Sequence, residues 1–203
     1  GAVFALLGLL VAFSFSGAAS RFEDRRHLIT QEANDIGTAW LRLDLLPAAA
    51  QPEIRAVFKR YLDLRIAAYA NVRDEAATAA TLASADALQA DIWRLAVAGV
   101  RSPEAAPGAT QVLLPALNAM FDIATTRKTA TRNHPPLAIY LLLGALCLVG
   151  SMLFGYAIGP SRNPNWLHKL AFAGITALAM YVVIDLEFPR RGLIRIDGDD
   201  QVL

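Results

Sequence analysis

The chain has 203 residues, of which 55% are hydrophobic and 18% are charged, and its formal net charge at pH 7 is +1. This composition is richer in apolar residues and poorer in charge than that of a soluble domain. The small net charge argues against a nucleic-acid-binding protein, whose domains are usually strongly basic. The single cysteine, Cys147, excludes an intramolecular disulfide and a multi-cysteine metal site.

Residues 1–19 are predicted to form a first transmembrane helix. The stretch from Ala2 to Ala19 carries no charge, and its length of about 18 residues nearly crosses the hydrocarbon core. The chain starts with Gly-Ala-Val-Phe, without a methionine or the basic start of a signal peptide, so we expect a preceding segment in a longer protein. No proline or turn cluster separates the apolar run from Arg21, so the helix should continue unbroken to about Leu46, just before Pro47.

Residues 20–134 are predicted to form a helical bundle outside the membrane. Apolar residues recur at three- and four-residue steps in four stretches, from Phe22 to Leu46, from about Gln51, from Ala76 to Val100 and from Thr110 to Thr131. There is no alternating strand pattern, so four amphipathic helices packed as an antiparallel bundle are expected. The acidic residues of the first stretch, which include Glu23, Asp24, Glu32 and Asp35, alternate with Arg and His in the manner of a solvated face.

Two further spans are predicted at residues 135–158 and 165–187, followed by a carboxyl-terminal tail at 188–203. The first is apolar and uncharged from Leu137 to Ile158, and the second carries its charges near its two ends. Glycine, asparagine and proline between 159 and 164 are typical of a turn, so these spans should form a tight antiparallel hairpin. The fold class is thus all-α: three transmembrane helices continuous with a four-helix bundle.

One face of the first span combines rings and hydroxyls. On an α-helix, Leu9, Phe13, Ser16 and Ser20 share this face. The small and hydroxylated residues from Ser14 to Ser20 can simply allow close helix contact. Alternatively, this face lines a pore, in which Phe13 is a hydrophobic gate above a polar ring. The residues alone leave both interpretations open.

Small residues on the second span also form a face. Ser151, Gly155 and Gly159 are spaced by four residues, which is typical of close helix contact, and Ala173 and Ala177 could meet them on the third span.

Acidic residues close the third span. Asp185 and Glu187 are followed by Arg190, and Arg21 and Arg25 follow the first span. A carboxylate at membrane depth is a functional candidate, but an interfacial ion pair that fixes the helix ends is the preferred interpretation.

Enzyme motifs are absent from the sequence. His27, His134 and His168 are far apart and lack metal-ligand spacing, and there is no glycine-rich phosphate loop or nucleophile elbow. No catalytic residue, metal or cofactor is therefore expected.

Two segments carry a family resemblance. FALLGLLVAFSFSGAASRFEDRRHLITQEANDIGTAWLRLDLLP, from Phe4 to Pro47, resembles the opening of the bacterial bestrophin-like family, and DLEFPRRGLIRID, from Asp185 to Asp197, resembles its close. The resemblance implies a multi-pass protein of the bacterial inner membrane, usually with one more span upstream. Through the family name it also implies kinship to the bestrophins, which are pentameric anion channels. It transfers no catalytic residue.

Positive charges predict the orientation of the spans. The bundle side of the spans carries Arg21, Arg25, Arg26, Arg127, Lys128, Arg132, Arg190 and Arg191, whereas the hairpin loop carries Arg162 and Lys169. The positive-inside rule therefore places the bundle in the cytoplasm.

Two functions compete on these grounds. The first is an oligomeric ion channel, with anions favoured by the resemblance, formed by copies of this chain. The second is a non-catalytic accessory or scaffolding subunit that packs in the membrane within a larger complex. Membrane lipid is an expected partner in either case, and nucleic acid is not.

Overall fold

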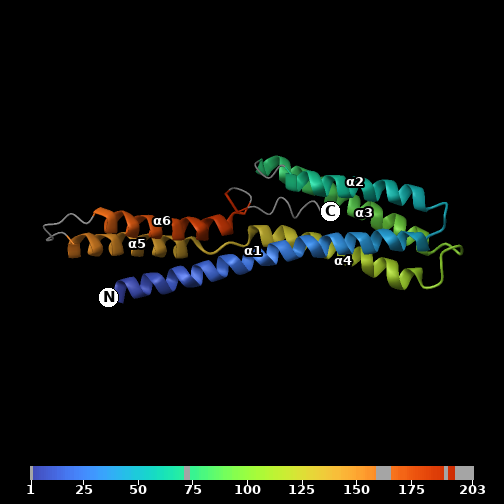
Figure 1. The fold of residues 1–203 in the computed structure, drawn as a ribbon. Helices are drawn as coiled ribbons and strands as arrows, with labels where there is room; N and C mark the ends of the chain where they lie inside the picture. The colour runs from blue at the N-terminus through green and yellow to red at the C-terminus, as the bar shows by residue number, and fades with distance from the viewer. Residues whose placement is uncertain (1, 71–73, 159–165, 190–191, 195–203) are drawn as a thin grey trace. The chain divides into compact units, whose positions relative to one another are not determined.

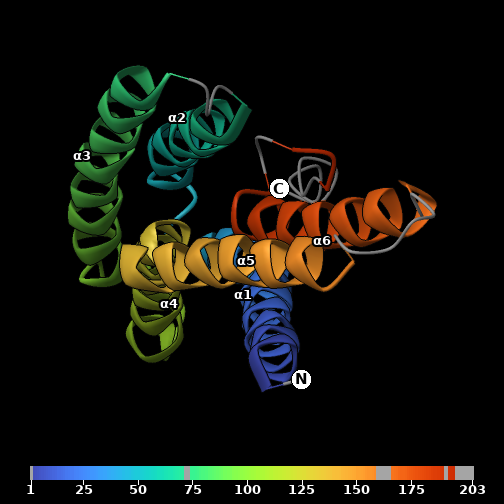
Figure 2. The ribbon, with the colours of Figure 1, turned by 90° about the vertical axis from the view of Figure 1, so that its left-hand side faces the viewer.

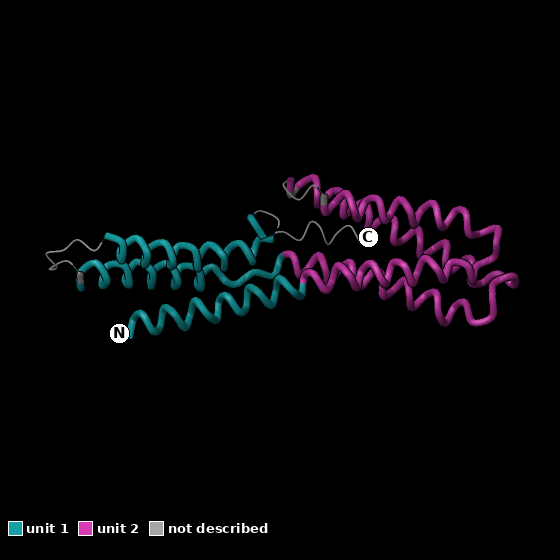
Figure 3. The backbone as a smooth tube through the Cα atoms, in the orientation of Figure 1, with its two compact units in different colours: residues 1–24, 132–195 teal, residues 25–131, 196–203 magenta. Residues whose placement is uncertain are grey.

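The computed structural model describes residues 2–70, 74–158, 166–189 and 192–194, and these residues contain helices and no strand. The elements are α1 (Ala2–Arg42), the 3-10 turn η1 (Leu43–Leu45), α2 (Gln51–Ala70), α3 (Glu75–Val100), α4 (Ala109–Arg132), α5 (Leu137–Ile158) and α6 (Trp166–Glu187), as shown in Figure 1. The predicted all-α fold is confirmed. The chain divides into two compact units (Figure 3): unit 1 contains residues 1–24 and 132–195, and unit 2 contains residues 25–131 and 196–203.

Helix α1 continues through the point where the apolar run gives way to charges. It is α-helical from Ala2 to Arg42, and the 3-10 turn η1 continues the helical path to Leu45. Leu46 is extended, with φ −79° and ψ 155°, as the steric bulk of a following proline requires. The predicted continuous helix is confirmed, although its α-helical part ends at Arg42 rather than at Leu46.

Unit 2 is a bundle made by the second part of α1 with α2, α3 and α4. Figure 2 shows α2 alongside α3. The apolar stripes expected from the sequence are buried, with Ile54, Phe58, Ile92, Leu117 and Met120 no more than 1% exposed. Phe58 packs edge-on against Trp40, with 5.5 Å between the ring centroids. Burial of these stripes against one another is the main stabilising term of the bundle.

Local signals set the helix ends of unit 2. The Asp74 side chain accepts a hydrogen bond of 2.9 Å from the backbone N–H of Ala77 and so caps α3. Gly108, before α4, has a φ of +79°, which side-chain-bearing residues rarely adopt. A Cβ on Gly99 would lie 2.9 Å from Cδ2 of Leu46, so this position requires glycine for close packing.

Within the part of the chain that the structure describes, three segments are long and apolar enough to cross a membrane, and they lie in α1, α5 and α6 of unit 1. Large apolar side chains point outward from it: Leu148, Met152 and Ile175 are at least 70% exposed. This is the reverse of the polar exterior of a soluble domain and suits contact with lipid. Inside unit 1, the ring of Phe172 stacks on Phe154 with 4.5 Å between centroids and meets Phe4 edge-on at 5.9 Å.

Candidate functional site

A group of polar side chains meets where the spans of unit 1 end. Glu187, the last residue of α6, is 1% exposed. Its Oε1 accepts hydrogen bonds from Nε of Arg21 at 2.8 Å and from Nη2 of the same guanidinium. Its Oε2 lies 3.5 Å from Nδ1 of His134, whose ring stacks on Phe188 with 4.6 Å between centroids. The antiparallel course of α5 and α6 explains the meeting, because it brings the start of one helix beside the end of the other.

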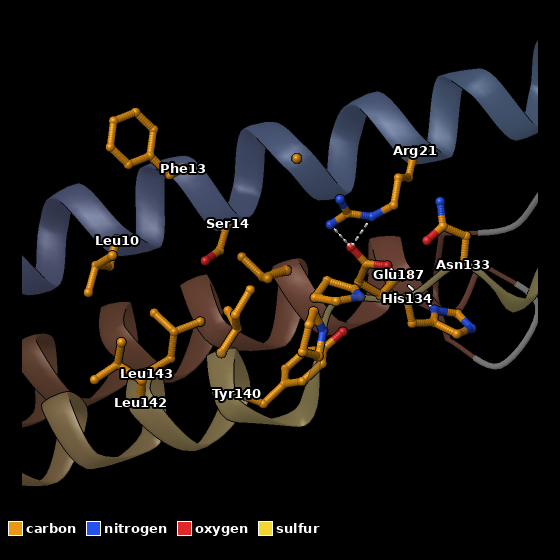
Figure 4. A pocket seen from close by; sticks show the side chains of 15 residues that line it. Leu10, Phe13, Ser14, Arg21, Asn133, His134, Tyr140, Leu142, Leu143 and Glu187 are labelled. Atoms are coloured by element: carbon orange, nitrogen blue, oxygen red, sulfur yellow. Dashed lines mark hydrogen bonds and ion pairs between the residues drawn. The ribbon is translucent and has the colours of Figure 1, made fainter. Parts of the chain in front are cut away.

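These residues form one end of a cavity of about 430 Å³, which we call the exit cavity. In Figure 4, Leu10, Leu142 and Leu143 lie toward its other end, and the Phe13 ring points away from it. Its lining consists of Leu10, Phe13, Ser14, Gly17, Arg21, Asn133, His134, Pro135, Pro136, Ile139, Tyr140, Leu142, Leu143, Val183 and Glu187. A pocket of this size with an apolar body and a few polar groups is typical of small-molecule sites.

Asp185 has a different partner from the one predicted. Its carboxylate accepts hydrogen bonds from the backbone N–H groups of Leu193, at 3.0 and 3.1 Å, and of Ile194, at 2.8 Å. The chain after α6 therefore folds back over the carboxylate, and backbone donors satisfy it. Of the predicted arginines, Arg21 pairs with Glu187 and Arg25 donates to the carbonyl of Ala130 at 3.2 Å. Arg190 lies outside the described residues.

Gly192→Ala is expected to break this fold-back. A Cβ at this position would lie 1.2 Å from Oδ1 of Asp185, so the carboxylate would have to leave its two backbone donors. We expect a loss of about 2 kcal/mol in the free energy of unfolding, the cost of unsatisfied buried polar groups. Thermal unfolding in detergent measures it. Gly174→Ala is the matched control, because no atom lies within 4 Å of its Cβ position and alanine favours a helix. Equal melting temperatures for the two variants would contradict the prediction.

The face predicted to line a pore points away from the rest of unit 1. Phe13 is 66% exposed and Leu9 is 52% exposed, and Ser16 and Ser20 are also exposed. The opposite face of α1 makes the contacts, with Leu7 and Ala18 buried. Within unit 1, the four residues therefore do not form a packing seam, and their role in a pore remains a prediction.

The small-residue face of α5 is not the contact between α5 and α6, which corrects the prediction for a single chain. Ser151, Gly155, Ala173 and Ala177 are exposed, and Gly159 lies outside the described residues. The stacked rings of Phe154 and Phe172 occupy the contact between the two helices instead, and bulky rings prevent close backbone approach.

A buried cluster of charges, which we call the bundle charge cluster, lies in the core of unit 2. Glu32 of α1, Arg65 of α2 and Arg127 of α4 are at most 3% exposed. Glu32 Oε1 accepts from Nε and Nη2 of Arg65 at 2.8 and 2.5 Å, and its Oε2 accepts from Nη1 of Arg127 at 2.5 Å. Tyr69 completes the cluster: its hydroxyl is 2.9 Å from Nη2 of Arg65, and Arg127 lies 3.7 Å above its ring.

Glu32 therefore does not belong to a solvated face, and that expectation was wrong. Its position between Ile29 and Ile36 on the buried stripe of α1 was a signal of burial. Burial alone would lower the pKa of Arg65, but the neighbouring Tyr69 and Glu32 raise it above its usual value. The guanidinium is therefore charged at every physiological pH, and the carboxylate between two such cations links three helices.

His134 is the functional candidate that sequence reasoning missed. No other histidine has a metal-ligand spacing to it, so the histidine pattern predicts no role for this residue. Its place directly before Pro135 and Pro136, at the start of one span, was the available signal. Glu187 ends the next span, and a hairpin of two spans brings these ends together.

The family pattern described as the Bestrophin-like domain matches residues 1–200 of the chain. The chain belongs to the bestrophin-like family. The match includes all three apolar spans and the bundle of this bestrophin-like protein, so it covers both the exit cavity and the bundle charge cluster. Searches of curated proteins and of solved structures found no match. Family membership and the three apolar helices together identify a membrane protein.

Proposed function

We propose that this bestrophin-like protein is an anion channel that acts as a homo-oligomer, with the Leu9, Phe13, Ser16 and Ser20 face of α1 lining the path. The exposure of this face carries the proposal. Two serine hydroxyls on an outward face at membrane depth are poorly accommodated by hydrocarbon. Copies of α1 arranged around an axis would turn these hydroxyls toward water.

The chemistry of the face suits a gated path. A ring of Phe13 side chains can dewet a narrow pore and close it without any charge. Ser16 and Ser20 follow it toward the charged part of α1, and their hydroxyls can donate hydrogen bonds to a partly dehydrated anion. The choice of anions rests on the kinship to the bestrophins that the family name implies. Ion passage needs no covalent chemistry, so the protein acts without catalysis.

We also propose that the protein lies in the bacterial inner membrane with its bundle in the cytoplasm. The excess of arginine and lysine near the span ends on the bundle side supports this orientation.

Chloride flux into proteoliposomes made with the natural full-length protein tests the channel. Phe13→Ala should raise the flux several-fold, because the variant removes the apolar constriction. Phe15→Ala is the matched control, since Phe15 is also exposed, at 47%, but projects from a different side of α1. Ser16→Ala should change the ratio of chloride to cation permeability while leaving the yield of folded protein unchanged.

Absence of flux from the full-length protein over a range of voltages and pH values would contradict the channel. So would equal flux from the Phe13→Ala and Phe15→Ala variants. A single copy bound to other membrane proteins, with Phe13 covered by one of them, would favour the accessory subunit.

A further inference from the structure

We propose that the exit cavity binds an anionic membrane lipid, with the headgroup at Arg21 and His134 and the upper part of an acyl chain along Leu10 and Leu143. Leu9, Ser16 and Ser20 are not among the residues that line the cavity, and the ring of Phe13, which borders it, points away from its interior (Figure 4), so this site does not depend on the proposed ion path.

The cavity is polar at one end and apolar at the other, and this order matches the headgroup and the acyl chain of a lipid. Its polar end lies where α5 begins, at Leu137, and where α6 ends, at Glu187. Its apolar end follows α1 and α5 into the spans (Figure 4). Lipid headgroups reside at the level where spans end and acyl chains at the level of the spans, so both parts of one lipid molecule meet matching walls.

The polar end offers hydrogen-bond donors to a phosphate. The Arg21 guanidinium lies across Gly17, whose added Cβ would be 3.3 Å from Nη1. Among the described residues, Nη1 of Arg21 and the Ser14 hydroxyl have no hydrogen-bond partner, whereas Nδ1 of His134 is buried and lies 3.5 Å from Oε2 of Glu187. Phosphate oxygens are acceptors only, and arginine is well suited to bind them.

Glu187 orients the site rather than blocking it. Its Oε1 is already held by two donors of Arg21, which fixes the guanidinium in place before a ligand arrives. A preoriented donor loses less conformational entropy on binding. Nη1 of Arg21 still faces the cavity, and the phosphatidylglycerol headgroup, unlike that of phosphatidylcholine, carries no cation of its own that competes with the guanidinium for the phosphate.

The test measures the melting temperature of the detergent-solubilised full-length protein during titration with short-chain phosphatidylglycerol, matched phosphatidylcholine and glycerol phosphate. A ligand that binds the folded state raises this temperature. Phosphatidylglycerol should stabilise the protein more than phosphatidylcholine does. Glycerol phosphate, which lacks the chain, should have little effect.

Two serine variants locate the site. Ser14→Leu places a bulky side chain in the cavity and should weaken phosphatidylglycerol binding by about tenfold or more. Ser16→Leu, on the opposite face, should bind as the unmodified protein does. Arg21→Gln should reduce the preference for phosphatidylglycerol over phosphatidylcholine.

Three results would overturn the proposal. These are equal stabilisation by the two lipids, equal binding by the Ser14→Leu and Ser16→Leu variants, and stabilisation by glycerol phosphate as strong as that by the lipid. The last result would indicate a site for a free anion instead. Chloride flux is not part of this readout, so failure here is distinguishable from failure of the channel proposal.

Discussion

Glu32→Gln is expected to lower the free energy of unfolding of the bundle by about 3–5 kcal/mol. Glutamine keeps the shape of the side chain but removes the negative charge between Arg65 and Arg127. The two guanidinium groups are at most 3% exposed, so water cannot replace the lost partner. The amide NH2 of glutamine also opposes one of the arginines, because it is a donor where the carboxylate was an acceptor.

Chemical unfolding in detergent, followed by the fluorescence of Trp40 and Trp93 in the bundle, measures this loss. Glu104→Gln is the matched control: Glu104 is exposed in the loop before α4, and the same substitution there should change stability by less than about 0.5 kcal/mol. Replacing Glu32, Arg65 and Arg127 together by apolar residues of similar size should cost much less than Glu32→Gln alone, because no buried charge then lacks a partner. Equal stability of the two glutamine variants would show that the cluster is not an important constraint.

The stability of the bundle should fall as the pH rises from 10 to 12, because of Tyr61. Burial is the main cause that raises the pKa of Tyr61 to about 12, while Gln89 is within hydrogen-bond reach of its hydroxyl. The unfolded chain releases this proton near pH 10, so between the two pKa values the folded state binds more protons than the unfolded state. The contribution of Tyr61 to the free energy of unfolding is fully present below pH 10. Between pH 10 and pH 12 it falls by about 1.4 kcal/mol per pH unit, or about 2.7 kcal/mol in total.

Melting temperatures recorded from pH 9 to pH 11 test this expectation. Tyr61→Phe should make the melting temperature less dependent on pH over this interval, because phenylalanine has no proton to release. Tyr156→Phe, the same change in α5 at an exposed tyrosine, leaves Tyr61 intact and should keep the shape of the curve. A decline of equal slope in the unmodified protein and in Tyr61→Phe would assign the loss to other groups.

Much of the fold could be predicted because the relevant signals are local in the sequence. Each signal can be recognised within one segment of the chain. Examples are the apolar length of α5, the prolines before it, and the absence of a helix-breaking residue near Arg21 in α1. Helix periodicity likewise indicates which residues of one helix are buried together, as Ile54 and Phe58 are. The pairing of Arg21 with Glu187 could also be anticipated, because both residues mark the end of a span.

The candidate sites were harder to predict because they join residues of different helices. Periodicity places Glu32 on the buried stripe of α1, but only the packing of α2 and α4 around α1 brings Arg65 and Arg127 to it. The contact between α5 and α6 shows the same limitation. Small residues at four-residue steps allow close approach, but the stacked rings of Phe154 and Phe172 occupy the contact instead.

The sequence alone therefore determined the all-α class, the three apolar spans, the continuity of α1 and the family to which this chain belongs. These properties depend on hydropathy, helix-breaking residues and motifs, each of which is readable along one segment. The tertiary structure decided which charges are buried together and where the exit cavity lies. It also decided that backbone N–H groups hold Asp185. These features depend on the rotation and register of one helix against another, which are set by the summed packing of many side chains.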